Sequence, residues 1–308
     1  MARRKKGNPV HGWLILDKPL GMTSTQAVGK VKWLYAAQKA GHAGTLDPLA
    51  TGILPIALGE ATKTVSFAVD GEKAYRFTVR WGIETNTDDA EGTPIATSDM
   101  RPTIAEIERI TPRFIGEIEQ VPPQFSAIKI EGNRAYDLAR SGEEVSLGPR
   151  LVVVEALRIV GQPDAVTTEF AAECGRGTYV RAIARDLGRA LGCRGHVTAL
   201  RRTRVGPFGE DDAVALAELV AAQADEARAG ELMRALLPVE AALDGLLGLN
   251  VTSSDAARLA RGQSVILRGR DAPVVSGGAY AMCKGQLVAM GEVEKGELRP
   301  TRVFNLGG

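Results

Sequence analysis

The stretch Gly41-His42-Ala43-Gly44-Thr45-Leu46-Asp47-Pro48-Leu49-Ala50-Thr51-Gly52 surrounds a single carboxylate with glycines, a proline, two threonines and a histidine. Glycine and proline impose irregular backbone shapes, so the stretch predicts a shaped loop. Asp47 in such a loop fits a nucleophile or a base, with His42 beside it. The alternative is a surface turn in which Asp47 caps the next segment, because loop aspartates commonly do so.

Two flanking segments extend this pattern. Leu16-Asp17-Lys18-Pro19-Leu20-Gly21-Met22-Thr23-Ser24 precedes it, and Leu54-Pro55 and Gly59-Glu60-Ala61-Thr62-Lys63 follow it. Together these residues resemble the signature of the bacterial tRNA pseudouridine-55 synthases, and further matching segments extend the resemblance over most of the chain. The resemblance implies a pseudouridine synthase fold, in which a central, mainly antiparallel sheet has the catalytic cleft across one face.

Length and charge bound the class of protein. A chain of 308 residues is long enough for a large core and predicts two domains, one of them small. A net charge of +1 excludes a strongly basic whole-protein nucleic-acid binder but leaves room for a local basic patch. Residues 1–8, which include Arg3 and Arg4, read as a disordered basic arm that either touches phosphates or is a solvated tail.

Cysteine and histidine spacing argues against a metal or disulfide framework. Cys174, Cys193 and Cys283 are scattered, and the three histidines lack ligand spacing. Asp88 and Asp89 could form a metal pair, but no further ligands accompany them at suitable spacing. We therefore expect neither metal nor cofactor. No apolar run reaches membrane-spanning length, and we expect a cytoplasmic protein.

Strands and helices are mixed without regular alternation, which predicts an α+β fold. Residues 74–81 alternate between apolar and polar side chains and predict a half-buried strand. Residues 151–160 and 166–174 predict a hairpin, and residues 24–37 and 178–191 predict helices. Residues 85–92 are polar and predict a loop. Alanine and leucine-rich stretches predict further helices at 213–222, 231–237 and 239–247.

Near Asn250 the pattern changes to a short helix over 253–260 and glycine-punctuated strands at 264–267, 279–284, 286–293 and 298–304. We expect a catalytic domain over residues 9–248 and a small β-rich module over residues 249–308. The module resembles the RNA-binding PUA domain, a weaker match that rests partly on its position in the chain.

The resemblance implies which residues perform the chemistry. Conversion of uridine to pseudouridine breaks the N1–C1′ bond and rejoins the base through C5, so no redox cofactor or energy source is needed. Asp47 matches the essential catalytic carboxylate; attack on the base, attack on the ribose and removal of a proton all stay open. Tyr75 matches the tyrosine that stacks on the target base and helps the late proton transfer, whereas by itself it would read as a core tyrosine.

A helix after Gly175 carries Arg181, Arg185 and Arg189 on one face, within a segment that holds eight arginines and one acid between residues 176 and 204. The face predicts phosphate binding, or else the solvated side of an ordinary amphipathic helix. Arg181 matches the family arginine that pairs with the catalytic aspartate. Arg202 we assign to RNA binding.

Four further residues are assigned to substrate or RNA contact. His42 matches the histidine that stacks in the gap left by the extruded base. Tyr179 matches a pocket tyrosine, and Leu200 matches an apolar pocket wall. Lys18, in the opening motif, is expected to have a structural or RNA-contacting role near the cleft.

Three functions compete. The first is isomerisation of one uridine in the T arm of tRNA by a monomer, with the module after Asn250 reaching the acceptor stem. The second is a tRNA-binding folding factor without essential chemistry, and the third is a guide-RNA-dependent synthase of the related archaeal and eukaryotic group. Asp47, Tyr75 and Arg181 together favour an enzyme, and Leu49-Ala50 with Leu54 to Lys63 favours the form without guide RNA.

Overall fold

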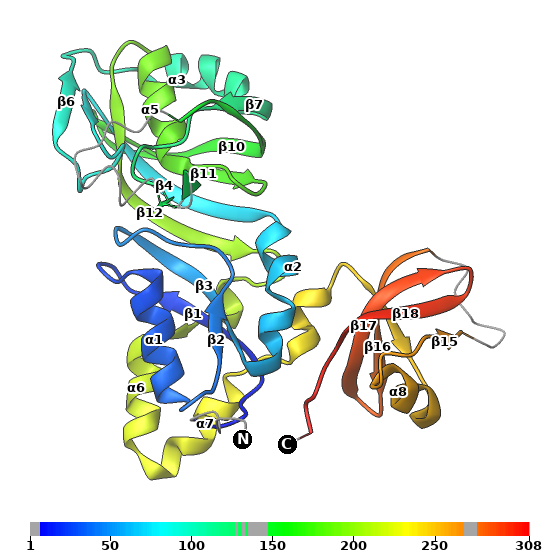
Figure 1. Cartoon of the computed structure of the whole chain (residues 1–308). Helices are drawn as coiled ribbons and strands as arrows, with labels where there is room; N and C mark the ends of the chain where they lie inside the picture. Colours follow the sequence, from blue (N-terminus) through cyan, green and yellow to red (C-terminus); the bar gives the residue numbers. More distant parts are fainter. Residues whose placement is uncertain (1–6, 127–128, 131–132, 135–146, 268–275, 308) are drawn as a thin grey trace.

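The computed structural model describes residues 7–126, 129–130, 133–134, 147–267 and 276–307 (Figure 1). Residues 1–6 of the predicted basic arm lie outside this part of the chain.

The main sheet has nine strands in the order β13-β1-β3-β12-β4-β11-β10-β7, with β2 paired to β3. Its strands are β1 (Gly12–Lys18), β2 (Ala40–His42), β3 (Ala50–Leu58), β4 (Lys73–Trp81), β7 (Gly116–Gln120), β10 (Arg150–Asp164), β11 (Thr167–Cys174), β12 (Gly195–Val205) and β13 (Val214–Ala215). All pairings are antiparallel except β1–β13 and β3–β12. The expected mainly antiparallel sheet and the β10–β11 hairpin are therefore confirmed.

The sheet consists of two halves that meet at the parallel β3–β12 pair. This junction pairs Ala50–Gly52 with Leu200–Arg202, a register of only three residues on each side. The first half-sheet (β13, β1, β3 and β2) combines residues 12–58 with residues 214–215, whereas the second (β12, β4, β11, β10 and β7) is one stretch of chain from 73 to 205. Figure 1 shows the two halves as its lower and upper parts.

Helices cover the halves separately. Those of the main body are α1 (Ser24–Leu34), α2 (Val65–Asp70), α3 (Ile104–Ile110), α5 (Val180–Ala190), α6 (Leu216–Ala224) and α7 (Ala229–Arg234), with 3-10 turns η1 (Gly59–Lys63), η2 (Thr111–Phe114), η3 (Glu210–Asp212), η4 (Glu226–Arg228) and η5 (Val239–Leu243). Thr23 caps α1 and Thr103 caps α3, each in a capping box with the residue three positions on. Both helices therefore begin where the sequence signals them.

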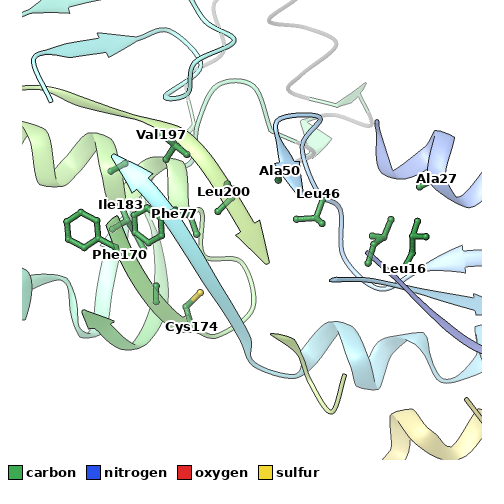
Figure 2. Close-up of a cluster of buried hydrophobic side chains, with 14 of the residues drawn as sticks. Leu16, Ala27, Leu46, Ala50, Phe77, Phe170, Cys174, Ile183, Val197 and Leu200 are labelled. Atoms are coloured by element: carbon green, nitrogen blue, oxygen red, sulfur yellow. The ribbon is translucent and has the colours of Figure 1, made fainter. Parts of the chain in front are cut away.

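The core follows the alternation of β4. Phe77, Val79 and Trp81 are buried, and Arg76 and Arg80 are exposed. Figure 2 shows Phe77 and Phe170 with Ile183 of α5 in one group, and Leu16 with Ala27 of α1 in another. Leu46, Ala50 and Leu200 lie between the two groups, at the junction of the half-sheets.

The β-rich C-terminal domain is a second sheet of five strands in the order β14-β16-β17-β18-β15. Its elements are β14 (Leu247–Asn250), α8 (Ser253–Leu259), β15 (Val265–Ile266), β16 (Gly277–Cys283), β17 (Gln286–Glu294) and β18 (Glu297–Val303). It packs on the main body through Met290 and Phe304, which share an apolar cluster with Ala61. Lys63 adds a hydrogen bond of 2.8 Å from its Nζ to the Val303 carbonyl.

One prediction for secondary structure is wrong. The helix expected over 239–247 is the short η5 followed by β14, because the segment turns to join the second sheet. The loop expected over 85–92 is confirmed for residues 86–92, although Asp88 and Asp89 within it are buried. Two-residue pairs β8 (Lys129–Ile130) with β9 (Asn133–Arg134), and a small hairpin of β5 (Ile83–Thr85) with β6 (Pro94–Thr97), complete the strands.

Candidate active site

A cavity of about 410 Å³ lies where the two half-sheets meet. Six of the eight predicted site residues line it: Asp47, Tyr75, Tyr179, Arg181, Leu200 and Arg202. Asp47 comes from the loop before β3, in the first half-sheet, and the others come from β4, the start of α5 and β12. The chain therefore brings together residues that are more than 150 positions apart.

The carboxylate of Asp47 is paired with Arg181. Arg181 Nε lies 2.9 Å from Asp47 Oδ2, and the Asp47 side chain stays 38% exposed while that of Arg181 is 5% exposed. A charge-assisted hydrogen bond of this length fixes the direction of a carboxylate. One oxygen of Asp47 is thereby held from the protein side, while the side chain stays open to the cavity.

The guanidinium of Arg181 is held by two backbone carbonyls. Its Nη1 donates to the Thr87 carbonyl at 2.7 Å and lies 3.5 Å from Asp89 Oδ2, and its Nη2 donates to the Phe125 carbonyl at 2.9 Å. Gln120 holds the residue at the start of α5, because its side-chain amide bonds both the N–H and the carbonyl of Tyr179. Arg181 is thus a preorganised partner for Asp47.

The Asp47 loop owes its shape to the opening motif. Ser24 Oγ donates to the Leu46 carbonyl at 3.0 Å and accepts from the Leu46 N–H at 2.8 Å. Gly52, the third residue of β3, has a φ of +92°, and a Cβ there would come within 2.2 Å of the Arg202 carbonyl. Only glycine therefore lets β3 approach β12 so closely.

Lys18 has a structural position. Its side chain is fully buried, and its ammonium donates to the carbonyls of Pro19 at 3.0 Å, Met22 at 2.6 Å and Pro48 at 3.5 Å. Burial lowers the pKa of Lys18 to about 8, although the charge of Asp47 opposes this shift. The residue does not line the cavity. Lys18 thus ties the opening motif to the residue that follows Asp47, and the structure favours the structural reading over RNA contact.

Arg202 is buried at the half-sheet junction. It is 2% exposed and donates from Nε to the Ile53 carbonyl at 2.8 Å, from Nη2 to the Gly44 carbonyl at 3.1 Å and from Nη1 to the Thr45 carbonyl at 3.4 Å. It also hydrogen-bonds the Tyr75 hydroxyl, and burial raises the pKa of Tyr75 and lowers that of Arg202. Its donors serve the protein, although Arg202 also lines the cavity, so its assignment to substrate or RNA binding stays a prediction.

The arginine face of α5 is not a phosphate-binding stripe. Arg181 and Arg185 are buried, and Arg185 Nη1 lies 2.9 Å from Asp88 Oδ2. Arg189 Nη2 lies 2.5 Å from Glu84 Oε1. Both readings of this face, solvated or phosphate-binding, are therefore wrong for its buried members. The acids come from a segment about 100 residues earlier, which a helical pattern does not reveal.

His42 lies in β2, where it pairs with Ile56 of β3. It is partly buried and does not line the cavity. The structure therefore places it five residues before Asp47 on the same connection, but outside the group that surrounds the carboxylate.

Sequence reasoning missed two residues that shape the cavity. Lys73 lines it, is buried, and donates to the carbonyls of Val69 and Gly71. Burial lowers the pKa of Lys73, and the charge of Arg202 lowers it further. Gln120 is buried and supports Tyr179. Lys73 is the first residue of β4 and is in phase with the buried Phe77, Val79 and Trp81, so its inward position could have been predicted from the alternation. Nothing in the sequence signals Gln120.

Within the described residues, no three histidine, cysteine or acidic side chains gather as they would around a metal ion. No helix in that part of the chain has the length and apolar character needed to cross a membrane.

Family models match most of the chain. The model of the TruB family pseudouridylate synthase N-terminal domain matches residues 32–180, and that of the tRNA pseudouridylate synthase B C-terminal domain matches residues 181–244. Among solved structures, an H/ACA RNP bound to a substrate RNA containing 2′-deoxyuridine is 25% identical, with a TM-score of 0.74 over 99% of this chain and 92% of that one. A Cbf5-Nop10-Gar1 complex is 26% identical, with a TM-score of 0.72 over 99% of this chain and 90% of that one.

Curated relatives are far more similar. The tRNA pseudouridine synthase B of Bradyrhizobium diazoefficiens is 60% identical over 316 residues, which cover all of this chain and 91% of that protein. That of Rhodopseudomonas palustris is 61% identical over 307 residues, covering 99% of this chain and 84% of its own length. The chain belongs to the TruB family of pseudouridylate synthases.

Proposed function

We propose that the protein isomerises uridine 55 in the T arm of tRNA to pseudouridine, with Asp47 as the essential carboxylate acting on a nucleoside swung out of the RNA. The observation that carries the proposal is the Asp47 carboxylate, accessible from a cavity and held at 2.9 Å by a buried arginine. The names of the curated relatives support the substrate.

The cavity suits a single extruded nucleoside. Its volume of about 410 Å³ lies within the range of small-ligand pockets. Tyr75 and Tyr179 supply aromatic surface, and Leu200 supplies an apolar wall. Flat side chains around one carboxylate are what an uncharged pyrimidine base requires, because stacking holds the ring while the acid reaches its edge or the sugar.

The reaction needs bond rearrangement within one nucleoside. The N1–C1′ bond breaks, C5 bonds to C1′, and the proton lost from C5 is balanced by one gained at N1. Asp47 is positioned to attack C6 or C1′, or to accept the C2′ proton, and Arg181 keeps its carboxylate directed in each case. The Tyr75 hydroxyl, oriented by its hydrogen bond with Arg202, serves the late transfer of the C5 proton.

Reaching uridine 55 requires its extrusion from a folded arm, at an unstacking cost of a few kcal/mol. We assign His42 to the gap left by the base, where ring stacking offsets part of that cost. The catalytic domain would comprise residues 9–248, and the PUA-like module over residues 249–308 would reach the acceptor stem. The enzyme would act as a monomer in the cytoplasm, without cofactor, metal or guide RNA.

Two other functions are separated by simple outcomes. A guide-RNA-dependent synthase is suggested by the H/ACA RNP structures at 25–26% identity, but the relatives at about 60% identity are named as tRNA enzymes. If the protein were instead a tRNA-binding folding factor, its effect on tRNA would persist after Asp47 is replaced.

The test is incubation of purified protein with an unmodified tRNA transcript, without guide RNA or metal, followed by mapping of pseudouridine. Product at position 55 alone is expected, and none when that uridine is replaced by cytidine. Asp47→Asn should abolish turnover while tRNA affinity stays within a few-fold. Asp17→Asn is the matched control, because Asp17 pairs with Arg201 and does not line the cavity. Turnover by Asp47→Asn would remove the residue from its role.

A further inference from the structure

Helix α5 meets the segment from Glu84 to Asp89 as a ladder of three arginines, one turn apart. Arg189 pairs with Glu84, and Arg185 pairs with Asp88. Arg181, at the end of the ladder, donates to the Thr87 carbonyl and lies 3.5 Å from Asp89. It also pairs with Asp47. Only this last rung borders the active-site cavity.

The middle rung joins the same two chain segments that hold Arg181. Arg185 Nη1 lies 2.9 Å from Asp88 Oδ2, and Arg185 Nη2 donates to the Val121 carbonyl at 2.7 Å. Arg181 bonds the carbonyls of Thr87 and Phe125, one residue and four residues away from those contacts. Fixing Asp88 and Val121 therefore fixes the two carbonyls that orient the Arg181 guanidinium.

The loop that carries Asp88 has its own internal bonds but is tied to the body at few points. Asp89 accepts from the Thr87 hydroxyl at 2.5 Å and from the Glu91 N–H at 3.0 Å. The Asp88 carbonyl accepts from the Val197 N–H of β12 at 3.0 Å. The Asp88 side chain adds the bond that fastens the loop to α5, next to the turn that bears Arg181.

The pair is not explained by stability. The side chains of Asp88 and Arg185 are 8% and 7% exposed. Burial raises the pKa of Asp88 to about 6, although Arg185, Arg181 and Arg189 lower it, and nearby Asp186 adds to the rise. The folded protein thus favours the charged form of Asp88 less than water does, as is common for buried ion pairs. A charge kept at such a site points to a role other than holding the fold.

We propose that Asp88 and Arg185 are a positioning pair for catalysis: they fix the loop from Thr85 to Gly92 on α5, so that the Thr87 carbonyl and Asp89 hold Arg181 against Asp47. The proposal rests on the proposed role of Asp47. Neither residue borders the cavity, so the pair acts through Arg181 and does not touch substrate.

The test is Asp88→Asn, which keeps the shape of the side chain and removes its charge. Arg185 retains Asp186, at 2.8 Å, so no unpaired buried charge is left behind. We expect the single-turnover rate on tRNA to fall about tenfold or more, since small displacements around a reacting group cost 10–100-fold. Affinity for tRNA should stay within twofold, and the thermal midpoint should stay level or rise.

Arg189→Gln is the matched control on the next rung. It leaves Glu84 with Arg194 and touches neither Thr87 nor Asp89, so the rate should be that of the unaltered protein. Arg185→Lys keeps one positive charge at the pair and should lose less rate than Asp88→Asn. If the Arg185→Lys variant fails to fold, the rate, thermal midpoint and tRNA affinity of Asp88→Asn still test the positioning role.

A pH profile adds a readout that a merely structural residue would not move. Charged groups around Asp88 are Arg181, Arg185, Arg189 and Asp186 of α5, with Glu84 and Glu119 in the adjoining cavity. As pH falls through about 6, Asp88 takes up a proton. The rate of the unaltered protein should therefore fall by a larger factor over this pH range than the rate of Asp88→Asn.

A full rate in Asp88→Asn, or a rate loss that only follows a lowered midpoint, would overturn the positioning role. Failure of the proposed function is a separate result, because it would appear as turnover by Asp47→Asn.

Discussion

Replacement of Arg181 by lysine tests the geometry of the site more sharply than loss of charge would. Arg181 uses three nitrogens in three directions, toward Asp47 at 2.9 Å, the Thr87 carbonyl at 2.7 Å and the Phe125 carbonyl at 2.9 Å. A lysine carries one nitrogen on a flexible stem and cannot reproduce that fork. Whichever acceptor the ammonium reaches, at least one charge-assisted hydrogen bond is lost.

The structure sets the size of the effect. A hydrogen bond to a charged group contributes about 1.5–3 kcal/mol. If that loss falls on the orientation of Asp47, the chemical step should slow roughly 10- to 100-fold, since each 1.36 kcal/mol is tenfold in rate. Binding should change little, because the Arg181 side chain is only 5% exposed and its contacts are internal.

The assay follows from the reaction itself. The hydrogen on C5 of uridine is released when C5 becomes the glycosidic carbon, so tritium at C5 reports turnover directly. Single-turnover release measures the chemical step, and retention of labelled tRNA on filters measures affinity. Arg176→Lys is the control, because Arg176 also lines the cavity but is 68% exposed and pairs with Asp70. An Arg181→Lys protein that reacts at the full rate, or that loses affinity in step with rate, would refute the reasoning.

Three further changes are expected to separate roles. Tyr75→Phe keeps stacking and removes the hydroxyl, so tritium release should slow with affinity retained; a full rate would end the proton-transfer role. His42→Ala should weaken tRNA binding by about 1–3 kcal/mol if its ring stacks in the vacated gap, and unchanged or tighter binding in a filter assay would contradict that placement. Lys18, with a folded pKa of about 8 against 10.5 unfolded, should make the free energy of unfolding rise by up to about 3 kcal/mol between those pH values, because the unfolded chain binds the additional proton there. Urea unfolding of Lys18→Met should lack this rise, and an identical pH slope in both proteins would show that Lys18 does not titrate in this way.

Much of the fold could be predicted from local sequence patterns. The alternation that ends in Trp81 predicted a strand with its apolar face inward, and the helix expected from residue 24 begins there. These features depend on neighbours within four residues, so a single sequence shows them. The expected helix over 239–247 failed because Leu247 pairs with Ala279, a partner 32 residues away.

The site residues that the family resemblance implies could be predicted from the sequence. The contacts between distant segments of the chain could not. The helical period placed Arg181, Arg185 and Arg189 on one face correctly, but it could not show that this face meets Glu84 and Asp88. Lys18 is a similar case, because its three carbonyl partners appear only once the chain has turned back on itself. Whether these lysine and arginine side chains are buried or exposed depends on such distant partners, and the residue type alone does not show it.

The divided sheet has a consequence for synthesis on the ribosome. Residues 73–205 can assemble one half-sheet as a continuous piece, but the other half waits for β13 and for Leu237, whose N–H and carbonyl both bond Trp13 of β1. At about 5–20 residues per second, the stretch from Leu58 to Val214 takes roughly 10–30 s to emerge. The Asp47 loop is therefore among the first segments to be synthesised and among the last to reach its native environment. Until residues 214–215 have emerged, the outer edge of β1 lacks its partner strand β13.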